Sequence, residues 1–208
     1  FAPDSLVVTG LSTWPGEERF LLETVRQLRE DPEKPIDARL LLVPRHMERR
    51  GAVVSELAAC EGGPVSMHLH SSALEAPEGT VVYIADTTGE MTRLMQVADL
   101  AFIGKSLSPN RGGQTPVEAA ALGQAMVYGP NMANFRSICA NLEGAGGVCK
   151  GECAADVRKH LCRLAHDPQE RRLMGERAKM WHRTQRGAAR RMAESLRALA
   201  TRGRGLDA

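Results

Sequence analysis

Short runs of aliphatic and β-branched residues recur along the chain, and within each run the apolar residues are continuous rather than alternating with polar ones. Continuous runs of this kind are typical of parallel strands that helices cover on both faces. They predict strands at residues 6–9, 39–43, 65–69, 81–85, 100–104 and 125–129, with a weaker strand at residues 147–150.

The intervals between these runs are amphipathic and predict helices at about residues 17–29, 48–60, 89–98, 116–122 and 135–141. Strands that alternate with helices indicate an α/β fold with a doubly wound, Rossmann-like parallel sheet. After Lys150 the strands stop, and three helical segments are predicted, divided at Asp167-Pro168 and at Gln185-Arg186-Gly187. We therefore expect a single domain over residues 1–208, with a helical C-terminal segment at about residues 154–202.

The composition agrees with one soluble globular domain, because 43% of the 208 residues are hydrophobic and 25% are charged. The formal net charge of +2 is too small to indicate a nucleic-acid-binding protein, and no apolar run approaches the roughly 18 residues that span a bilayer. The five cysteines lack disulfide-framework or zinc-site spacing, so we expect free thiols in a reducing compartment. Because the chain starts with Phe1 and a predicted strand follows almost at once, we expect it to be part of a longer protein.

Three predicted loops, at residues 12–18, 86–90 and 112–118, share a design in which a Thr precedes a carboxylate in the first turn of the next helix. In sheets of this class ligands bind beyond the carboxyl ends of the strands, so these loops form the candidate site. The spacings Thr87-x-x-Glu90 and Thr115-Pro116-x-Glu118 fit capping boxes, with Pro116 at the first helical position. They also fit a phosphate or carboxylate site built from free backbone N–H groups at helix N-termini, and the two interpretations are compatible.

Other residues at the same edge suit an anionic ligand. Gly112 and Gly113 let the backbone approach a ligand closely, and Glu118 is placed to accept hydrogen bonds from ribose hydroxyls. The basic residues at the strand ends are Arg45, His46, Lys105 and Arg111. Arg45 is the strongest candidate, because it follows a buried strand through Pro44 and its planar guanidinium suits phosphate or carboxylate.

Several other chemistries lack their motifs. No G-x-G-x-x-G follows the first strand and no G-x-x-x-x-G-K-[ST] occurs, which argues against a dinucleotide-dependent oxidoreductase and a P-loop ATPase. His68-x-His70 lies on a predicted strand, where this spacing is more typical of one exposed face than of a metal site. We expect no metal ion and no cofactor.

The loop motifs form an ordered set that extends to about Ile138. The set comprises Ser12-Thr13-x-x-Gly16-Glu17-Glu18, Pro44-Arg45-His46-x-Glu48-Arg49, Asp86-Thr87-x-Gly89-Glu90, Ala98-Asp99-x-Ala101-Phe102-Ile103-Gly104-x-Ser106-Leu107, Arg111-Gly112-Gly113-x-x-Pro116-x-Glu118-x-Ala120-Ala121-Leu122-Gly123 and Gly129-Pro130-x-x-x-Asn134-Phe135. In this order the motifs resemble the C-terminal domain of the bacterial 3-deoxy-D-manno-octulosonic acid (Kdo) transferases of lipopolysaccharide synthesis, which have the GT-B glycosyltransferase fold.

The resemblance implies that the complete protein transfers Kdo from CMP-Kdo to a lipid A precursor, with inversion at the anomeric carbon and without a metal at the donor phosphate. The residues expected around the CMP moiety are Pro44, Arg45, Thr88, Gly89, Glu90, Thr115, Pro116, Val117 and Glu118. The residues expected to support them are Ser12, Thr13, Gly16, Lys105, Arg111, Gly112, Gly113, Gln114 and Asn134.

In that family the general base, the membrane anchor and the acceptor groove belong to an N-terminal domain, which the resemblance places outside this chain. We therefore assign no catalytic residue here and expect the chain alone to bind the donor without catalysing transfer. The resemblance implies a complete protein at the cytoplasmic face of the bacterial inner membrane, whereas this fragment is expected to be soluble.

Three positions depart from the family pattern, which usually has His at the positions of Trp14 and Gln114, and Asn at the position of Thr115. Gln exchanges hydrogen bonds but cannot carry a proton, so an acidic or cationic role at position 114 is lost. A related sugar acid or a different acceptor is therefore an alternative.

The C-terminal segment suggests other partners, because its basic residues outnumber its acidic ones. The basic residues are Arg171, Arg172, Arg177, Lys179, Arg183, Arg186, Arg190, Arg191 and Arg197. A basic helical face can bind nucleic acid or an anionic membrane, but the interleaved Met180, Trp181 and Met192 favour an amphipathic helix packed on the sheet or on a partner domain. Membrane-surface contact is the second interpretation, and we expect no nucleic-acid partner.

Since a fold does not fix a function, three alternatives stay open: a UDP-sugar-dependent GT-B transferase, an epimerase-like domain, and a degenerate module without catalysis.

Overall fold

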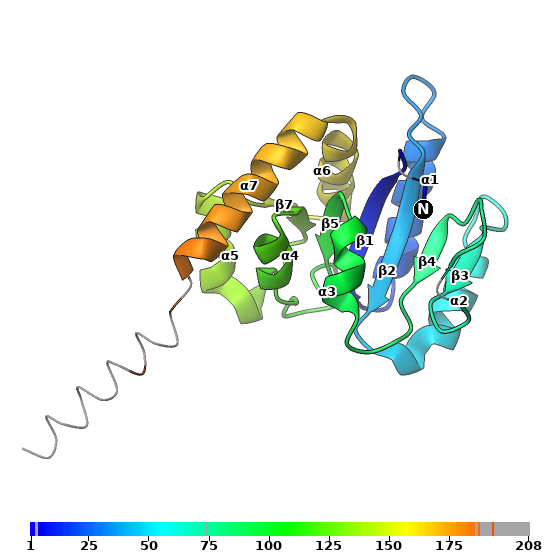
Figure 1. The fold of residues 1–208 in the computed structure, drawn as a ribbon, viewed down its shortest axis with the longest axis horizontal. Helices are drawn as coiled ribbons and strands as arrows, with labels where there is room; N and C mark the ends of the chain where they lie inside the picture. Colours follow the sequence, from blue (N-terminus) through cyan, green and yellow to red (C-terminus); the bar gives the residue numbers. More distant parts are fainter. Residues whose placement is uncertain (3, 74, 186, 188–192, 194–208) are drawn as a thin grey trace, which may run out of the picture.

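The computed structural model describes residues 1–2, 4–73, 75–185, 187 and 193. At its centre lies a seven-stranded sheet in the order β3-β4-β2-β1-β5-β6-β7, and all recorded strand pairs are parallel (Figure 1). The strands are β1 (Leu6–Thr13), β2 (Ala38–Pro44), β3 (Met67–Leu69), β4 (Val82–Ile84), β5 (Leu100–Ile103), β6 (Ala125–Tyr128) and β7 (Cys149–Lys150). The predicted α/β class and all seven predicted strands are confirmed.

Helices connect most of the strands. The α-helices are α1 (Glu17–Arg29), α2 (Arg50–Ala58), α3 (Met91–Leu94), α4 (Val117–Leu122), α5 (Arg136–Gly144), α6 (Ala154–His166) and α7 (Pro168–Gln185). Short 3-10 turns are η1 (Met47–Arg49), η2 (Met95–Val97) and η3 (Ala133–Phe135). The first two of the three helical segments predicted after Lys150 are confirmed as α6 and α7, and the third lies outside the described residues.

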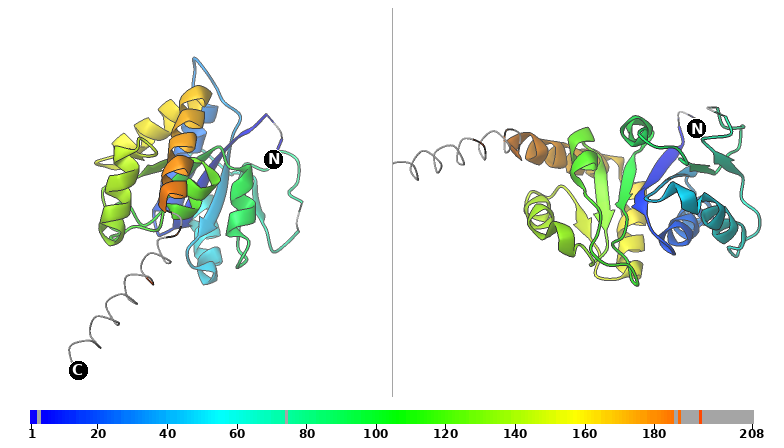
Figure 2. Two further views of the ribbon diagram at one scale, coloured as in Figure 1. Left: turned by 60° about the vertical axis from the view of Figure 1, so that its left-hand side comes forward. Right: turned by 90° about the horizontal axis from the view of Figure 1, so that it is seen from below.

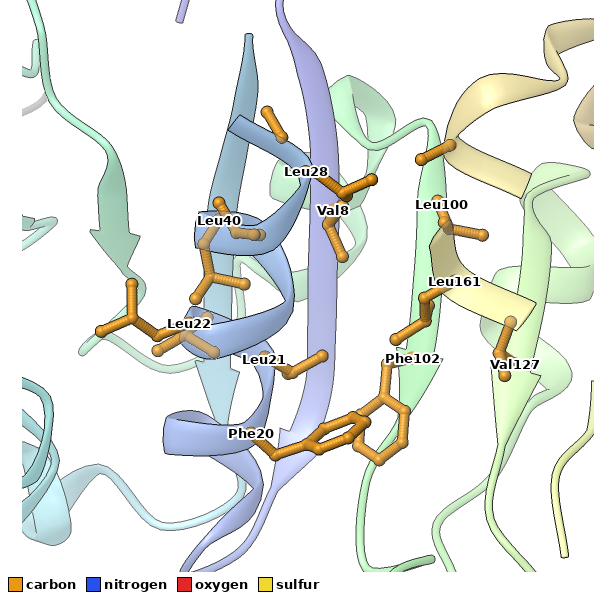
Figure 3. Packing of buried hydrophobic residues seen from close by; sticks show 14 of the residues in the cluster. Val8, Phe20, Leu21, Leu22, Leu28, Leu40, Leu100, Phe102, Val127 and Leu161 are labelled. Carbon is orange, nitrogen blue, oxygen red and sulfur yellow. The ribbon is translucent and has the colours of Figure 1, made fainter. Parts of the chain in front are cut away.

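The sheet is buried on both faces, as the continuous apolar runs predict. Along β1, Val8 packs on the face that carries α1, α2 and α6, whereas Val7 packs on the face that carries α3, α4, α5 and α7. Figure 2 shows the helices on both sides of the sheet. On the face that carries α1, α2 and α6, Phe20 of α1 packs against Phe102 of β5 with ring centroids 6.0 Å apart (Figure 3). Burying each such ring contributes roughly 2 to 3 kcal/mol.

The helix α7 is amphipathic in the way that its sequence predicts. Its buried side, which includes Met174, Ala178 and Trp181, faces the molecule, while Arg172 and Arg183 are exposed. The other predicted tail arginines from Arg186 onward lie outside the described residues. Within the described ranges, no helix combines the length and the apolar character that crossing a bilayer requires.

Candidate functional site

The candidate site lies at the carboxyl edge of the sheet, where the loops after β1, β2, β4, β5 and β6 leave the strands. Hydrogen bonds between backbone groups join several of these loops directly. The N–H of Arg45 donates to the carbonyl of Thr13 at 3.2 Å, and the N–H of Gly113 donates to the carbonyl of Lys105 at 3.1 Å. The N–H of Asn134 donates to the carbonyl of Gly112 at 2.9 Å. Most of the predicted loops are therefore brought to one edge, as the parallel topology requires.

Glu17, at the start of α1, fastens the first loop to the loop after β5. Its buried carboxylate accepts the backbone N–H groups of Lys105, Ser106 and Leu107 at 2.7, 2.9 and 3.1 Å, and that of Trp14 at 3.0 Å. Burial raises the pKa of Glu17, and these backbone hydrogen bonds oppose the increase. Glu17 belongs to the first of the predicted loop motifs. Its role as an acceptor could not be predicted, because the N–H groups that it binds lie nearly ninety residues further along the chain.

The two loops also approach each other through Gly104. A Cβ atom at Gly104 would overlap the backbone carbonyl of Ser12, so a side chain is excluded there. Ser12 and Lys105 have positive φ angles of 52° and 59°, an uncommon conformation for residues other than Gly. Strain of this kind is concentrated at functional sites, and here it lies at the register shift near the end of β1 and just after β5.

The glycine loop packs closely against other side chains of the protein, and its predicted close approach to a ligand stays a prediction. Gly112 and Gly113 have φ angles of 101° and 72°, and a Cβ atom on them would overlap the side chains of Asn134 and Met132. Both glycines are buried, whereas Arg111 beside them is exposed.

Trp14, one of the three departures from the family pattern, is part of a stack of side chains. The Lys105 ammonium lies 4.2 Å from the centroid of its ring, and the ring of His46 lies edge-on at 5.3 Å. The indole therefore positions a cation and an imidazole that both belong to the candidate edge. A cation over the face of a Trp ring gains roughly 0.5 to 1 kcal/mol where the site is exposed.

Glu118, in the first turn of α4, carries a buried carboxylate oxygen, Oε2, for which no hydrogen-bond partner is recorded. The capping prediction is half confirmed, because the Thr115 hydroxyl accepts the N–H of Val117 at 3.2 Å. The reciprocal bond of a capping box, in which the Glu118 carboxylate accepts the backbone N–H of Thr115, is not recorded. Pro116 is the N-cap residue rather than the first helical residue. The Glu118 carboxylate is therefore not recorded as capping its own helix.

The loop after β4 differs from its predicted capping box. The Thr87 hydroxyl donates to Glu90 Oε2 at 2.6 Å instead of capping the backbone, and Glu90 itself is the N-cap of α3 without a side-chain cap bond. Thr88 and Gly89 are exposed at the tip. Burial opposes the ionisation of Asp86, but hydrogen bonds from the N–H and hydroxyl of Ser71 outweigh it and hold the pKa of Asp86 below its ordinary value.

Arg45 and Arg111 add positive charge to this edge, beside that of Lys105. Both side chains are exposed, and no ion pair is recorded for either among the described residues. Arg49 by contrast donates to the fully buried carboxylate of Glu18 at 3.0 Å and is therefore a structural partner. Free guanidinium groups and backbone N–H groups can bind phosphate or carboxylate, while Glu118 can accept hydroxyl hydrogens.

A cleft of about 540 Å³ lies beside the glycine loop, toward β6 and α5. Its lining includes Arg111, Gly112, Tyr128, Arg136 and Lys150. Only the first two of these residues belong to the predicted site. The lining of this cleft includes none of the residues predicted around CMP, and of the predicted site residues Val117 and Gln114 are half-buried.

The prediction that His68 and His70 mark an exposed face is wrong. Their exposed fractions are 8% and 9%, because Tyr83 of β4 covers both rings, with ring centroids 5.3 and 5.7 Å away. Nε2 of His68 is hydrogen-bonded to the carbonyl of Ala73 at 2.7 Å, and His70 contacts Tyr83 and Glu90. Sequence spacing alone does not reveal that cover.

No protein-family model matches the chain. Among curated proteins, it is 28% identical over 190 residues to a 3-deoxy-D-manno-octulosonic acid transferase of Bordetella pertussis, which is 91% of this chain and 44% of that protein. It is 31% identical over 188 residues to a protein of the same name from Haemophilus influenzae, which is 89% of this chain and 42% of that protein. The chain thus spans less than half the length of these relatives.

Solved structures agree on the fold. The C-terminal CMP-Kdo binding domain of WaaA from Acinetobacter baumannii aligns with a TM-score of 0.76 and 24% identity, over 86% of this chain and 90% of that one. WaaG, a glycosyltransferase involved in lipopolysaccharide biosynthesis, aligns with a TM-score of 0.57 and 14% identity, over 89% of this chain and 44% of that one. The parallel sheet and its loop-built edge therefore define a Rossmann-like domain of the GT-B glycosyltransferase class. The chain belongs to the 3-deoxy-D-manno-octulosonic acid transferase family and corresponds to the C-terminal domain of its members.

Proposed function

We propose that this chain is the donor-binding domain of an enzyme that transfers Kdo from CMP-Kdo to a lipid A precursor. The observation that carries the proposal is the unpartnered, buried Oε2 of Glu118, held at the same sheet edge as the free guanidinium groups of Arg45 and Arg111. A nucleotide bound to an acidic sugar presents hydroxyl groups, a phosphate and a carboxylate, which are the partners that such an edge can accept. The curated relatives carry the name of this activity.

In this proposal each group acts by binding and orientation. Glu118 accepts hydrogen bonds from the ribose, and Arg45 binds the phosphate of the departing CMP, whose negative charge grows as the glycosidic bond breaks. A fixed cation at that position stabilises the transition state more than the ground state. Lys105, held over the ring of Trp14, supplies a second positive charge for the sugar carboxylate. The general base and the acceptor groove are expected from the N-terminal part of the complete protein.

The proposal extends to the place of action, which is the cytoplasmic face of the inner membrane. The acceptor is a lipid there, and the exposed arginines of α7 offer positive charge to anionic headgroups. Vesicle flotation of the complete protein, with and without anionic lipid, tests this contact.

The transferase activity is tested with the complete protein, CMP-Kdo and a lipid A precursor. We expect product formation that Arg45→Ala lowers by about 10- to 100-fold, as is typical for the loss of a charged phosphate contact. Turnover of a UDP-sugar and none of CMP-Kdo would contradict the proposal.

A second candidate is a UDP-sugar-dependent transferase. The fold is shared with Anabaena HepE in complex with UDP and glucose, with a TM-score of 0.62 and 16% identity over 94% of this chain and 49% of that one, and such a shared fold leaves the nucleotide open. Trp14 and Gln114, which depart from the Kdo transferase pattern, line the same edge. Nucleotide preference separates the two candidates.

A further inference from the structure

A chain of hydrogen bonds leads from the sheet to Glu90, one of the residues expected around the nucleotide. Tyr83 of β4 is hydrogen-bonded through its hydroxyl to Nδ1 of His70. Nε2 of the same imidazole lies 2.7 Å from Glu90 Oε2. The Thr87 hydroxyl donates to this oxygen at 2.6 Å. Two donors from different loops therefore fix one oxygen of Glu90.

The Glu90 carboxylate determines the direction of its bond with His70. An ionised carboxylate only accepts, so Nε2 of His70 carries the hydrogen that it shares with Glu90. In the neutral imidazole Nδ1 is then an acceptor, and the Tyr83 hydroxyl donates to it. Burial raises the pKa of Tyr83, which keeps the phenol protonated and able to donate.

The consequence for Glu90 is a carboxylate with two unlike oxygens. Hydrogen bonds from Thr87 and then His70 hold the pKa of Glu90 below its ordinary value, so the group stays ionised. Oε1 has only the exposed Arg93 guanidinium recorded beside it, at 4.0 Å, and the side chain of Glu90 is 32% exposed. Oε1 is thus the acceptor that this loop offers to a ligand.

We propose that His70, backed by Tyr83, is a positioning residue that holds Glu90 Oε2 so that Oε1 accepts an N–H or O–H group of the bound nucleotide. This inference rests on the proposed function for the identity of the nucleotide. Two donor groups fit the same acceptor chemistry: the exocyclic amine of cytosine, which uracil replaces by an acceptor oxygen, and a ribose hydroxyl, which both nucleosides carry. Contact with the amine makes Glu90 a determinant of base selectivity.

The experiment is calorimetric titration of the chain with CMP and with UMP, for wild type, His70→Leu, His70→Gln and Glu90→Ala. We expect His70→Leu to weaken CMP binding by about tenfold, the usual effect of losing a hydrogen bond to a charged group. His70→Gln, whose amide can still donate toward Glu90, is expected to restore most of the affinity. In a Glu90→Ala background, His70→Leu is expected to cause no further loss, because residues that act through one contact are not additive.

His68→Leu is the matched control. It lies two residues away on β3, is 8% exposed, and its ring packs on Tyr83 with centroids 5.3 Å apart, but it binds the Ala73 carbonyl rather than Glu90. It is expected to lower thermal stability and to leave CMP affinity unchanged. Equal affinity losses for His68→Leu and His70→Leu, or an undiminished effect of His70→Leu without Glu90, would overturn the proposal.

Comparison of CMP with UMP distinguishes the two donor groups, and the pKa of Glu90 tests the hydrogen bonds without a ligand. Loss of CMP affinity with little change for UMP supports contact with the amine, and equal losses support a ribose hydroxyl. Carbon-13 NMR of the Glu90 carboxyl tests the relay without any ligand, since its pKa is expected to rise in His70→Leu and not in His68→Leu. An unchanged pKa overturns the relay. Failure of wild type to bind CMP, with the pKa shift intact, refutes the proposed function and the nucleotide contact but not the relay.

Discussion

Glu17 on α1 accepts a hydrogen bond of 2.7 Å from the backbone N–H of Lys105, which lies 88 residues further along the chain. The same carboxylate accepts three more backbone N–H groups, two of them in the loop after β5. These bonds hold the loop after β5 in the site proposed for the donor. Lys105 carries one of the positive charges of that site, and its carbonyl accepts the N–H of Gly113.

Replacing Glu17 by Ala is expected to destabilise the domain by about 3 kcal/mol, because several buried N–H groups lose their acceptor at once. Urea denaturation measures the change in the free energy of unfolding. Glu23→Ala is the control on the same helix, where the carboxylate pairs with Arg19 and Arg158 near the surface and its loss costs less than about 1 kcal/mol. Equal losses for the two variants would refute a special role for Glu17.

Replacement by Ala is expected to change the stability of the protein in opposite directions at two glycines. Gly104→Ala forces a Cβ atom onto the carbonyl of Ser12 and is expected to cost at least about 2 kcal/mol of stability. Gly51, in the first turn of α2, has open space around it, so Gly51→Ala is expected to gain about 0.5 to 1 kcal/mol. Thermal denaturation of both variants gives the sign of each change, and a stable Gly104→Ala protein contradicts the close approach of the two loops.

Glu118→Ala is expected to weaken CMP binding by about 1 to 3 kcal/mol, the usual loss when a charged hydrogen-bond partner is removed. The structural reason is the buried Oε2 that no group in the described part of the chain is recorded to contact. Calorimetric titration measures the affinity, and a melting curve measures stability in parallel. Unchanged affinity together with lower stability would show that Glu118 serves only its helix.

Acid stability is expected to depend on Asp86. Its pKa is lower in the folded state than its ordinary value of 3.8, so the folded protein binds fewer protons than the unfolded one as the carboxyl titrates. This contribution is fully present above pH 3.8 and is lost as the pH falls through the folded pKa. Ser71→Ala removes the hydroxyl donor at Asp86 and is expected to flatten the decline of unfolding free energy in that range.

The neighbouring Ser72→Ala is the control for this prediction. The Ser72 hydroxyl donates to the carbonyl of Leu69 and does not contact Asp86 in the recorded bonds. Its pH profile of stability is expected to run parallel to wild type. A parallel profile for Ser71→Ala as well would show that the bond between Ser71 and Asp86 does not contribute to acid stability.

The sequence predicts this fold well because local patterns determine it. The helix predicted at residues 17–29 has the observed bounds of α1, since Gly16 takes the left-handed conformation at its start and apolar residues then recur at helical spacing. The edge that carries Arg45, Lys105 and Glu118 follows from parallel strands. By contrast, the burial of His70 and the acceptor role of Glu17 depend on segments distant in sequence that fold against them. Thr87 misled the capping prediction because α3 begins at Met91, three residues later than a cap at Thr87 requires, and the Thr87 hydroxyl donates to Glu90 instead.

Calorimetric titration of this domain with CMP, at low and moderate salt and with UMP, AMP and UDP as controls, tests whether this sheet edge binds CMP. We predict selective binding of CMP that weakens as salt increases, because exposed cations bind its phosphate. Preference for UDP, or no binding of any of the four nucleotides, would contradict the assignment of this sheet edge as a CMP site.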